Sequence, residues 1–216
     1  MFRFYKKAGR KIYSFIRFKR RKSVTENFNA ARQLTAGEIA LVREIYKDTI
    51  RYRDVKVHRG KYFFKQPPGS GMTPNGEIYV ADDPKRGNFL YKDDYSTESP
   101  ALKAFFIHEM AHVWQYQNNI LRVKISAVLG QVRHLGKYNK MYKYTLEEGR
   151  NLFDYGIEQQ AAIIEDYYIV VKENMPEFCA GRIQNQCSPA KKKELLEKVM
   201  ADFIFDPTCS RNMNGF

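Results

Sequence analysis

The stretch ALKAFFIHEMAHVWQYQN, residues 101–118, decides how the rest of the chain is arranged. Its apolar side chains recur at helical spacings and cover most sides of such a helix, and the preceding Ser99-Pro100 is a common helix start. These apolar positions are Leu102, Phe105, Phe106, Met110, Val113 and Trp114. We therefore expect a largely buried helix from Pro100 to about Asn118, with the other elements packed around it.

The residues before this helix predict one further helix and a small β region. Thr35 and Glu38 form a T-x-x-E capping box, and apolar residues at helical spacing follow as far as Ile50. Apolar and charged residues alternate around 55–57 and again within 76–81, as in short strands. Proline and glycine in the segment QPPGSGMTPN (66–75) predict an irregular loop between these strands, and a second loop is expected over 82–99.

Two more helices are expected after residue 150. One runs from Leu152 to about Glu173, and the last begins at Ser188-Pro189. A chain of 216 residues with 44% apolar residues is large enough to bury one core without disulfides. The prediction is an α+β fold, mostly α-helical, with a small β region before the 100–118 helix and a single domain over residues 23–216.

The net charge of +13 is concentrated at one end of the chain. Residues 1–22 contain ten of the 37 basic side chains and no acidic one, so the other 194 residues carry a net charge of only +3. Residues 1–22 form a basic amphipathic arm, either a solvated tail or a candidate for docking to a partner or an anionic surface. The nearly balanced body argues against a nucleic-acid-binding domain.

Neither a membrane-spanning segment nor a secretory signal peptide is predicted. No stretch approaches the roughly 18 apolar residues that a membrane helix needs, and no apolar run follows the basic N-terminus. Three cysteines, Cys179, Cys187 and Cys209, lie in the last 40 residues and are too few for a disulfide framework. A Cys179–Cys187 bridge and free thiols both remain open alternatives.

The buried helix carries the chemistry-bearing motif, His108-Glu109-Met110-Ala111-His112, which is an H-E-x-x-H pattern. Residues four apart share one helix face, so His108 and His112 can bind one metal ion. Glu109 then lies beside the metal, where it can act as general base on a water molecule. A glutamate in an otherwise apolar helix is costly to bury without such a role.

A catalytic zinc site needs a third protein ligand. The pattern H-E-x-x-H-x-x-G-x-x-H is not met, because Gln115 and Asn118 stand at the glycine and third histidine positions. The remaining histidines are His58 and His134, so a carboxylate from another helix is the favoured ligand. The candidates are Glu147, Glu148, Asp154, Glu158, Glu165 and Asp166. Of these, Glu158 is favoured by its spacing on the 152–173 helix and Glu165 comes second.

Four ordered blocks give the chain a family resemblance. They are MTPNGEIYV (72–80), DDYS (93–96), FIHEMAHVWQYQ (106–117) and DYGIEQQAAIIEDYY (154–168). Together they resemble the zinc-metallopeptidase domain at the C-terminal end of some VgrG-type spike proteins of the bacterial type VI secretion system. The resemblance covers about residues 29–172 and leaves the arm and the tail at 176–216 unmatched. It implies a zincin-like fold of the glutamate type, with Glu158 of the E-Q-Q-A block as the third ligand.

We accordingly expect one Zn²⁺ per chain, held by His108, His112 and Glu158, with Glu109 as general base of a peptide-bond hydrolase. A further donor would stabilise the negative charge of the transition state. The candidates for this donor are His134, Tyr138, Tyr142 and Tyr144. Asp166 is a candidate for orienting a zinc-bound histidine, and Gln115 for a hydrogen bond to the ligand-bearing helix.

The resemblance also implies a biological role. The chain is expected to be a free-standing antibacterial effector, exported without a signal peptide and cleaving an envelope protein in the periplasm of a target cell. Expected partners are a protein or peptide substrate, a VgrG-type spike or loading adaptor, and a cognate immunity protein. The alternative is a non-catalytic zinc-binding module that docks on a spike protein, although Glu109 would not be needed for that role.

Overall fold

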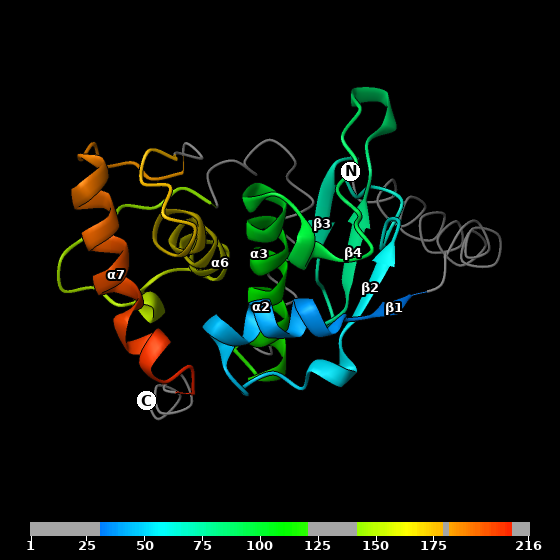
Figure 1. Cartoon of the computed structure of the whole chain (residues 1–216), viewed down its shortest axis with the longest axis horizontal. Coiled ribbons are helices and arrows are strands. Elements are labelled where there is room, and N and C mark those ends of the chain that lie inside the picture. The colour runs from blue at the N-terminus through cyan, green and yellow to red at the C-terminus, as the bar shows by residue number, and fades with distance from the viewer. Residues whose placement is uncertain (1–30, 121–141, 179–181, 209–216) are drawn as a thin grey trace, which may run out of the picture.

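A computed structural model describes residues 31–120, 142–178 and 182–208 of the chain. Within these ranges the fold is α+β, and helices outweigh a four-stranded sheet. Helix α3 (Pro100–Gln117) stands between the sheet and helix α6 (Ile157–Tyr167), as Figure 1 shows. Helix α7 (Pro189–Phe205) packs on the far side of α6. The helix predicted from residues 101–118 is therefore the central element of the fold.

The sheet has the strand order β1-β2-β4-β3. Its strands are short: β1 (Arg32–Gln33), β2 (Lys56–Arg59), β3 (Ser70–Met72) and β4 (Ile78–Ala81). Strands β2 and β4 are parallel, with Val57 opposite Ile78, whereas β1 and β3 are antiparallel to their neighbours. Strand β3 consequently lies at one edge of the sheet.

The prediction of an irregular loop over 66–75 is wrong at its centre, because β3 lies inside it. Pairing with β4 stabilises this strand: Met72 lies opposite Tyr79, and the Gly69 N–H donates to the Ala81 carbonyl at 2.7 Å. Backbone hydrogen bonds to a neighbouring strand outweigh the weak strand propensity of Ser-Gly-Met. Strand β1 was not predicted either, for it has only two residues.

Helix α2 (Ala36–Tyr46) begins as predicted, at the reciprocal capping box of Thr35 and Glu38. It ends four residues before Ile50, because Lys47 adopts a φ of 49° and leaves the helical conformation. The Tyr46 hydroxyl donates to the Ile107 carbonyl at 2.8 Å and ties α2 to α3.

The prediction of one continuous helix over 152–173 is also wrong. Residues Leu152–Asp154 form a separate 3-10 turn (η4), which Asn151 and Asp154 cap reciprocally. Helix α6 begins only after Gly156, and beyond Tyr167 it continues as a π-helical turn, Tyr168–Lys172 (η5). The capped turn interrupts the helix because its side chains satisfy the backbone groups that would otherwise extend it.

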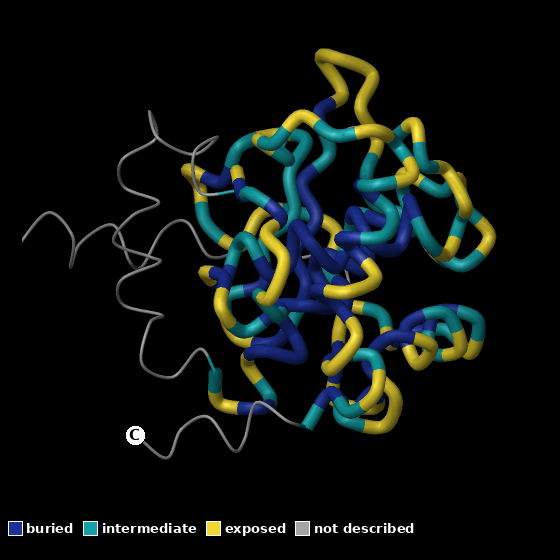
Figure 2. The backbone as a smooth tube through the Cα atoms, turned by 90° about the vertical axis from the view of Figure 1, so that its left-hand side faces the viewer, coloured by how far each residue is buried: buried dark blue, intermediate teal, exposed yellow. Residues whose placement is uncertain are grey.

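The core surrounds α3, in which every residue from 106 to 115 is buried. Trp114 packs edge-on against Phe203 of α7 at a ring-centroid distance of 4.9 Å, and Phe153 of η4 lies against both rings. Figure 2 shows the same arrangement, with buried backbone in the interior and exposed backbone on the outer turns. An apolar environment therefore encloses the motif helix on several sides.

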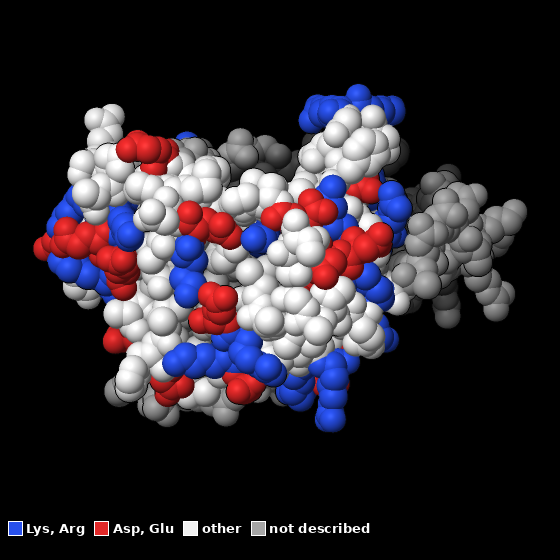
Figure 3. All heavy atoms as spheres, viewed as in Figure 1, with Lys and Arg blue, Asp and Glu red and all other residues white. Residues whose placement is uncertain are grey.

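Basic and acidic side chains are interspersed on the face drawn in Figure 3, and Lys and Arg gather at the tip of the loop that projects after β4. Among the described residues, no helix combines the length and apolar character needed to cross a bilayer. Cys187 forms no disulfide with another described residue. The 1–22 arm, Cys179 and Cys209 lie outside the described ranges.

Candidate metal centre

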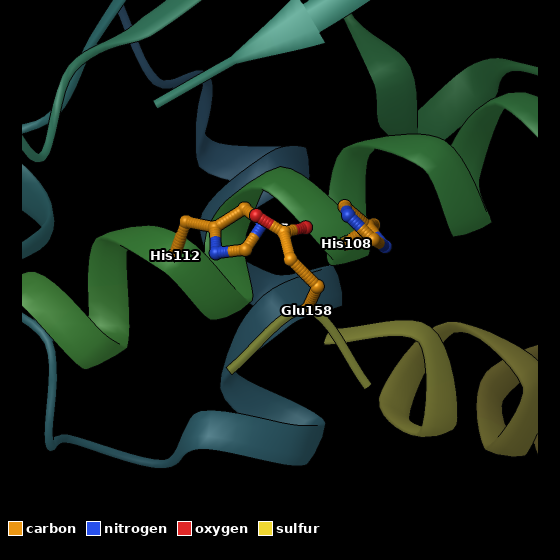
Figure 4. A group of neighbouring side chains, drawn as sticks. All are labelled: His108, His112 and Glu158. Carbon is orange, nitrogen blue, oxygen red and sulfur yellow. Dashed lines mark ion pairs between the residues drawn. The ribbon is translucent and has the colours of Figure 1, made fainter. Parts of the chain in front are cut away.

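The centre is built on one face of α3. His108 and His112, four residues apart, present their rings on the same side with centroids 5.1 Å apart. Packing of the neighbouring apolar residues into the core fixes the rotation of the helix, and both histidines are less than a tenth exposed. The sequence motif thus becomes a pair of buried imidazoles that point toward α6 (Figure 4).

Glu158, in the first turn of α6, completes the group. One ligand atom from each of His108, His112 and Glu158 can be chosen so that all three lie within 4.8 Å of one another. Nε2 of His112 lies 3.4 Å from Oε2 of Glu158. This carboxylate oxygen is buried and makes no hydrogen bond among the described residues. Such an unsatisfied buried oxygen is costly unless a cation neutralises it.

The electrostatics of the centre couple His112 to Glu158. Burial favours the neutral imidazole of His112, but the carboxylate of Glu158 outweighs it and raises the pKa of His112 to about 9. Burial likewise opposes ionisation of Glu158, yet the neighbouring His112 and His108 lower its pKa to about 2. Without a metal the two groups form an oppositely charged pair, so a bound dication would replace the proton of His112.

Gln115 holds His112 and the ligand-bearing helix together. Its Oε1 lies 2.9 Å from Nδ1 of His112, and its Nε2 donates to the Ile157 carbonyl and to Gln160 Oε1, both at 3.0 Å. An amide oxygen only accepts, so Nδ1 of His112 carries the hydrogen and Nε2 faces Glu158. The structure therefore places Gln115 at the expected contact with α6 and also against His112.

Glu109 lies next to the two histidines on α3 and faces β3. The Thr73 hydroxyl donates to Glu109 Oε2 at 2.6 Å, and both residues are buried. A Cβ atom at Gly71 would lie only 2.2 Å from Glu109 Oε1, so only glycine leaves room for this carboxylate. Sequence reasoning missed Thr73 and Gly71, although Thr73 belongs to the MTPNGEIYV block that carries the family resemblance.

The proposed donors are placed differently by the structure. The ring of Tyr142 lies 5.8 Å from the ring of His108, and its hydrogen bond helps to lower the pKa of Glu158. The Tyr144 hydroxyl instead donates to Asp166 at 2.5 Å, so its hydrogen is already engaged and the expectation of a transition-state donor is not supported. His134 and Tyr138 lie outside the described residues.

The structure places Asp166 against Tyr144 and Arg182 rather than directly against a histidine. Oε2 of Glu165 instead lies 2.9 Å from Nδ1 of His108. Residues 158 and 165 are seven apart and share one face of α6, and residue 166 is rotated away by about 100°. Glu165 therefore approaches the centre from behind His108 rather than as a third ligand.

The other candidate residues lie away from the centre. Glu147 pairs with Arg150, Glu148 pairs with Lys191, and Asp154 caps the η4 turn. His58 contacts Glu77 at 2.8 Å and stacks on Tyr79. Within the described residues, His108, His112 and Glu158 are the only group of histidine, cysteine and carboxylate side chains close enough to share a metal ion. Two imidazoles and one carboxylate fit a zinc ion of the catalytic type.

Comparisons with known proteins place the chain in a family. No family model matches the chain. The type VI secretion system spike protein VgrG2b of Pseudomonas aeruginosa is 38% identical over 144 residues, which are 67% of this chain and 13% of that protein. The solved effector domain of VgrG2b superimposes with a TM-score of 0.56 at 30% identity, covering 83% of this chain and 87% of the domain.

This chain belongs to the family of VgrG2b effector domains. The resemblance to spike-borne effector domains expected from the four sequence blocks is thereby confirmed, and the homology supports an effector role. The chain spans about 13% of the length of the full spike protein. The activity, substrates and partners of the whole spike protein are therefore not carried over with the fold.

Proposed function

We propose that this VgrG2b-type effector domain is a zincin-like, zinc-dependent endopeptidase. The observation that carries the proposal is the convergence of His108, His112 and Glu158 within 4.8 Å. The motif carboxylate of Glu109 is close enough to His112 to act on its charge. His108, His112 and Glu158 would hold one Zn²⁺ per chain. Bound zinc would lower the pKa of a water molecule and polarise the carbonyl group of the peptide bond.

The chain's own residues would handle the proton. Glu109 would take the proton from the attacking water and give it to the leaving amine. The hydrogen bond from Thr73 fixes one oxygen of this carboxylate, so that the second oxygen is available for the proton. Tyr142, beside His108 and Glu158, is the described candidate for stabilising negative charge in the transition state.

The buried position of Glu109 supports catalysis over the alternative of a non-catalytic docking module. Glu109 is not one of the three grouped ligands, and a glutamine there would leave the zinc ligands intact. A buried carboxylate is expensive, yet here Thr73 and the missing side chain of Gly71 accommodate it. A module that only binds zinc would gain nothing from this arrangement.

The family supports a biological setting for the activity. The domain would be delivered by a type VI machine with a VgrG-type spike or adaptor as loading partner. It would cleave an envelope protein in the periplasm of a rival cell. A cognate immunity protein would protect the producing cell.

The test combines zinc content with toxicity of the full chain directed to the periplasm. Wild type is expected to contain one zinc per chain and to be toxic. Glu109→Gln should keep the zinc and lose toxicity, and His112→Ala should lose both. Glu77→Gln is a matched control, because Glu77 is a half-buried carboxylate that contacts His58 rather than the centre. Full toxicity of both Glu109→Gln and His112→Ala would overturn the proposal.

A further inference from the structure

A buried chain of charged groups contacts Nδ1 of His108. Oε2 of Glu165 is 2.9 Å from Nδ1 of His108 and 2.5 Å from Nη1 of Arg182. The second terminal nitrogen of Arg182 lies 3.0 Å from Asp166, which in turn accepts the hydrogen bond from Tyr144. The planar guanidinium thus bridges two adjacent carboxylates, only one of which faces the centre.

The backbone around Arg182 holds it in this position. The Tyr144 N–H donates to the Arg182 carbonyl at 3.0 Å, and the Gln184 N–H donates to the Tyr144 carbonyl at 2.9 Å. The side chain of Asn185 bonds both the N–H and the carbonyl of Leu146 at 3.1 Å. Residues 182–185, which follow α6, are thereby held against residues 144–146, which precede α6.

Glu165 lies beside a fixed positive charge. Its Oε2 contacts Nη1 of Arg182 as well as Nδ1 of His108, and a guanidinium is always protonated. Nδ1 of His108 makes no hydrogen bond that meets geometric criteria, so its 2.9 Å contact with Glu165 is an ion-pair contact. An anion 2.9 Å from Nδ1 still favours the tautomer with hydrogen on Nδ1, which leaves the lone pair of Nε2 free.

We propose that Glu165, held by Arg182, is a positioning residue that fixes the ring orientation and tautomer of His108 for metal binding. The inference rests on the proposed zinc site and extends it. The centre then has one support behind each imidazole: Gln115 behind His112 and the Glu165–Arg182 pair behind His108. The segment around Arg182, outside the blocks that carry the family resemblance, becomes part of the metal centre.

Glu165→Gln and Arg182→Lys in the full chain test this role. The glutamine keeps the shape of Glu165 without its charge, and the lysine keeps the charge of Arg182 but cannot bridge two carboxylates. Zinc dissociation constants are measured by competition with a chromophoric chelator. The expected weakening is about 10- to 100-fold for Glu165→Gln and smaller for Arg182→Lys, as for other residues that orient metal ligands.

Arg32→Lys is the matched control. Arg32 forms a partly buried two-pronged pair with Glu38, at 2.7 and 2.8 Å, away from the centre. It should lower stability without changing zinc affinity. A second readout is the ¹⁵N spectrum of the His108 ring in the metal-free protein. It should show hydrogen on Nδ1 in wild type and a mixture of tautomers in Glu165→Gln, a change that general destabilisation would not produce.

The outcomes separate this inference from the proposed function. If His108→Ala abolishes zinc binding while both Glu165→Gln and Arg182→Lys bind zinc within twofold of wild type, the positioning role is wrong and the zinc site stands. If the wild-type protein binds no zinc, both the positioning role and the proposed zinc site are wrong. Should Glu165→Gln not fold, Arg182→Lys carries the test with the same two readouts.

Discussion

The two sides of helix α3 hold their carboxylates in different ways. Toward α6, Glu158 and Glu165 lie close to histidine rings, and their negative charge is balanced by imidazole and guanidinium groups. Toward β3, Glu109 meets no cation within salt-bridge distance among the described residues and is held by the hydroxyl of Thr73 beside Gly71. On the proposed function the difference separates two tasks: the α6 side would organise a cation site, and the β3 side would keep one carboxylate free to accept a proton.

The largest effect is expected from Glu158→Ala, which removes a zinc ligand on the α6 side. Removing the third ligand by Glu158→Ala should weaken zinc binding by roughly 10²- to 10³-fold, since a binding free energy of about 10–16 kcal/mol is shared among about four ligands. Turnover should be lost with the metal. Chelator competition measures the affinity. An unchanged dissociation constant would show that Glu158 is not a ligand.

Gly71→Ala should disturb only Glu109, on the β3 side, and leave the zinc ligands in place. The added methyl group would overlap Oε1 of Glu109 and the end of the Phe105 ring, so both side-chain ends must move. A displacement of about 1 Å in a reacting group can cost about 100-fold in turnover. Peptidase activity should fall by this order while zinc content stays at one per chain. Loss of zinc together with activity would contradict the separation of the two sides.

Thr73→Val should give a milder version of the same effect. Valine matches the shape of threonine but cannot donate to Glu109, and a hydrogen bond to a charged group is worth about 1.5–3 kcal/mol. We expect kcat to fall by about 10-fold with unchanged zinc affinity. Thr73→Ser, which restores the donor, is the control. Equal kcat for Val and Ser variants would show that the hydroxyl does not position Glu109.

Gln115→Leu should produce an effect of similar size, but on the α6 side. It removes the acceptor for His112 and the donor to Ile157 and Gln160. Zinc affinity should fall by about 10-fold, the lower end for residues that orient a ligand. Turnover per zinc-loaded molecule should stay near wild type, which activity assays at saturating zinc would check. A large drop in kcat at full zinc occupancy would contradict this assignment.

The α6 side was more predictable from the sequence than the β3 side. Helical periodicity and the H-E-x-x-H spacing predict α3 and its two imidazoles, because residues four apart share a face whatever else surrounds the helix. The block carrying Glu158 also identified α6 as the partner helix. The contact of Glu165 with His108 was not predicted, because the sequence does not show how α6 is rotated against α3.

Contacts distant in the sequence explain the rest. Strand β3 consists of Ser-Gly-Met and exists through its pairing with β4, so no local pattern predicts it or its approach to Glu109. Arg182 reaches Glu165 through a backbone bridge to Tyr144, a contact that neither residue's neighbours in the sequence indicate. These two features carry the proposed roles of Gly71, Thr73 and Arg182, and only the three-dimensional structure shows them.

X-ray absorption at the zinc edge of the purified protein tests the central claim most directly. A centre made by His108, His112 and Glu158 predicts a first shell of two imidazole nitrogens and oxygen ligands at about 2.0–2.2 Å, without sulfur. The His112→Ala variant should show one imidazole fewer in whatever zinc it retains. A spectrum with sulfur scattering at about 2.3 Å would contradict the account, and so would failure of the purified protein to bind added zinc.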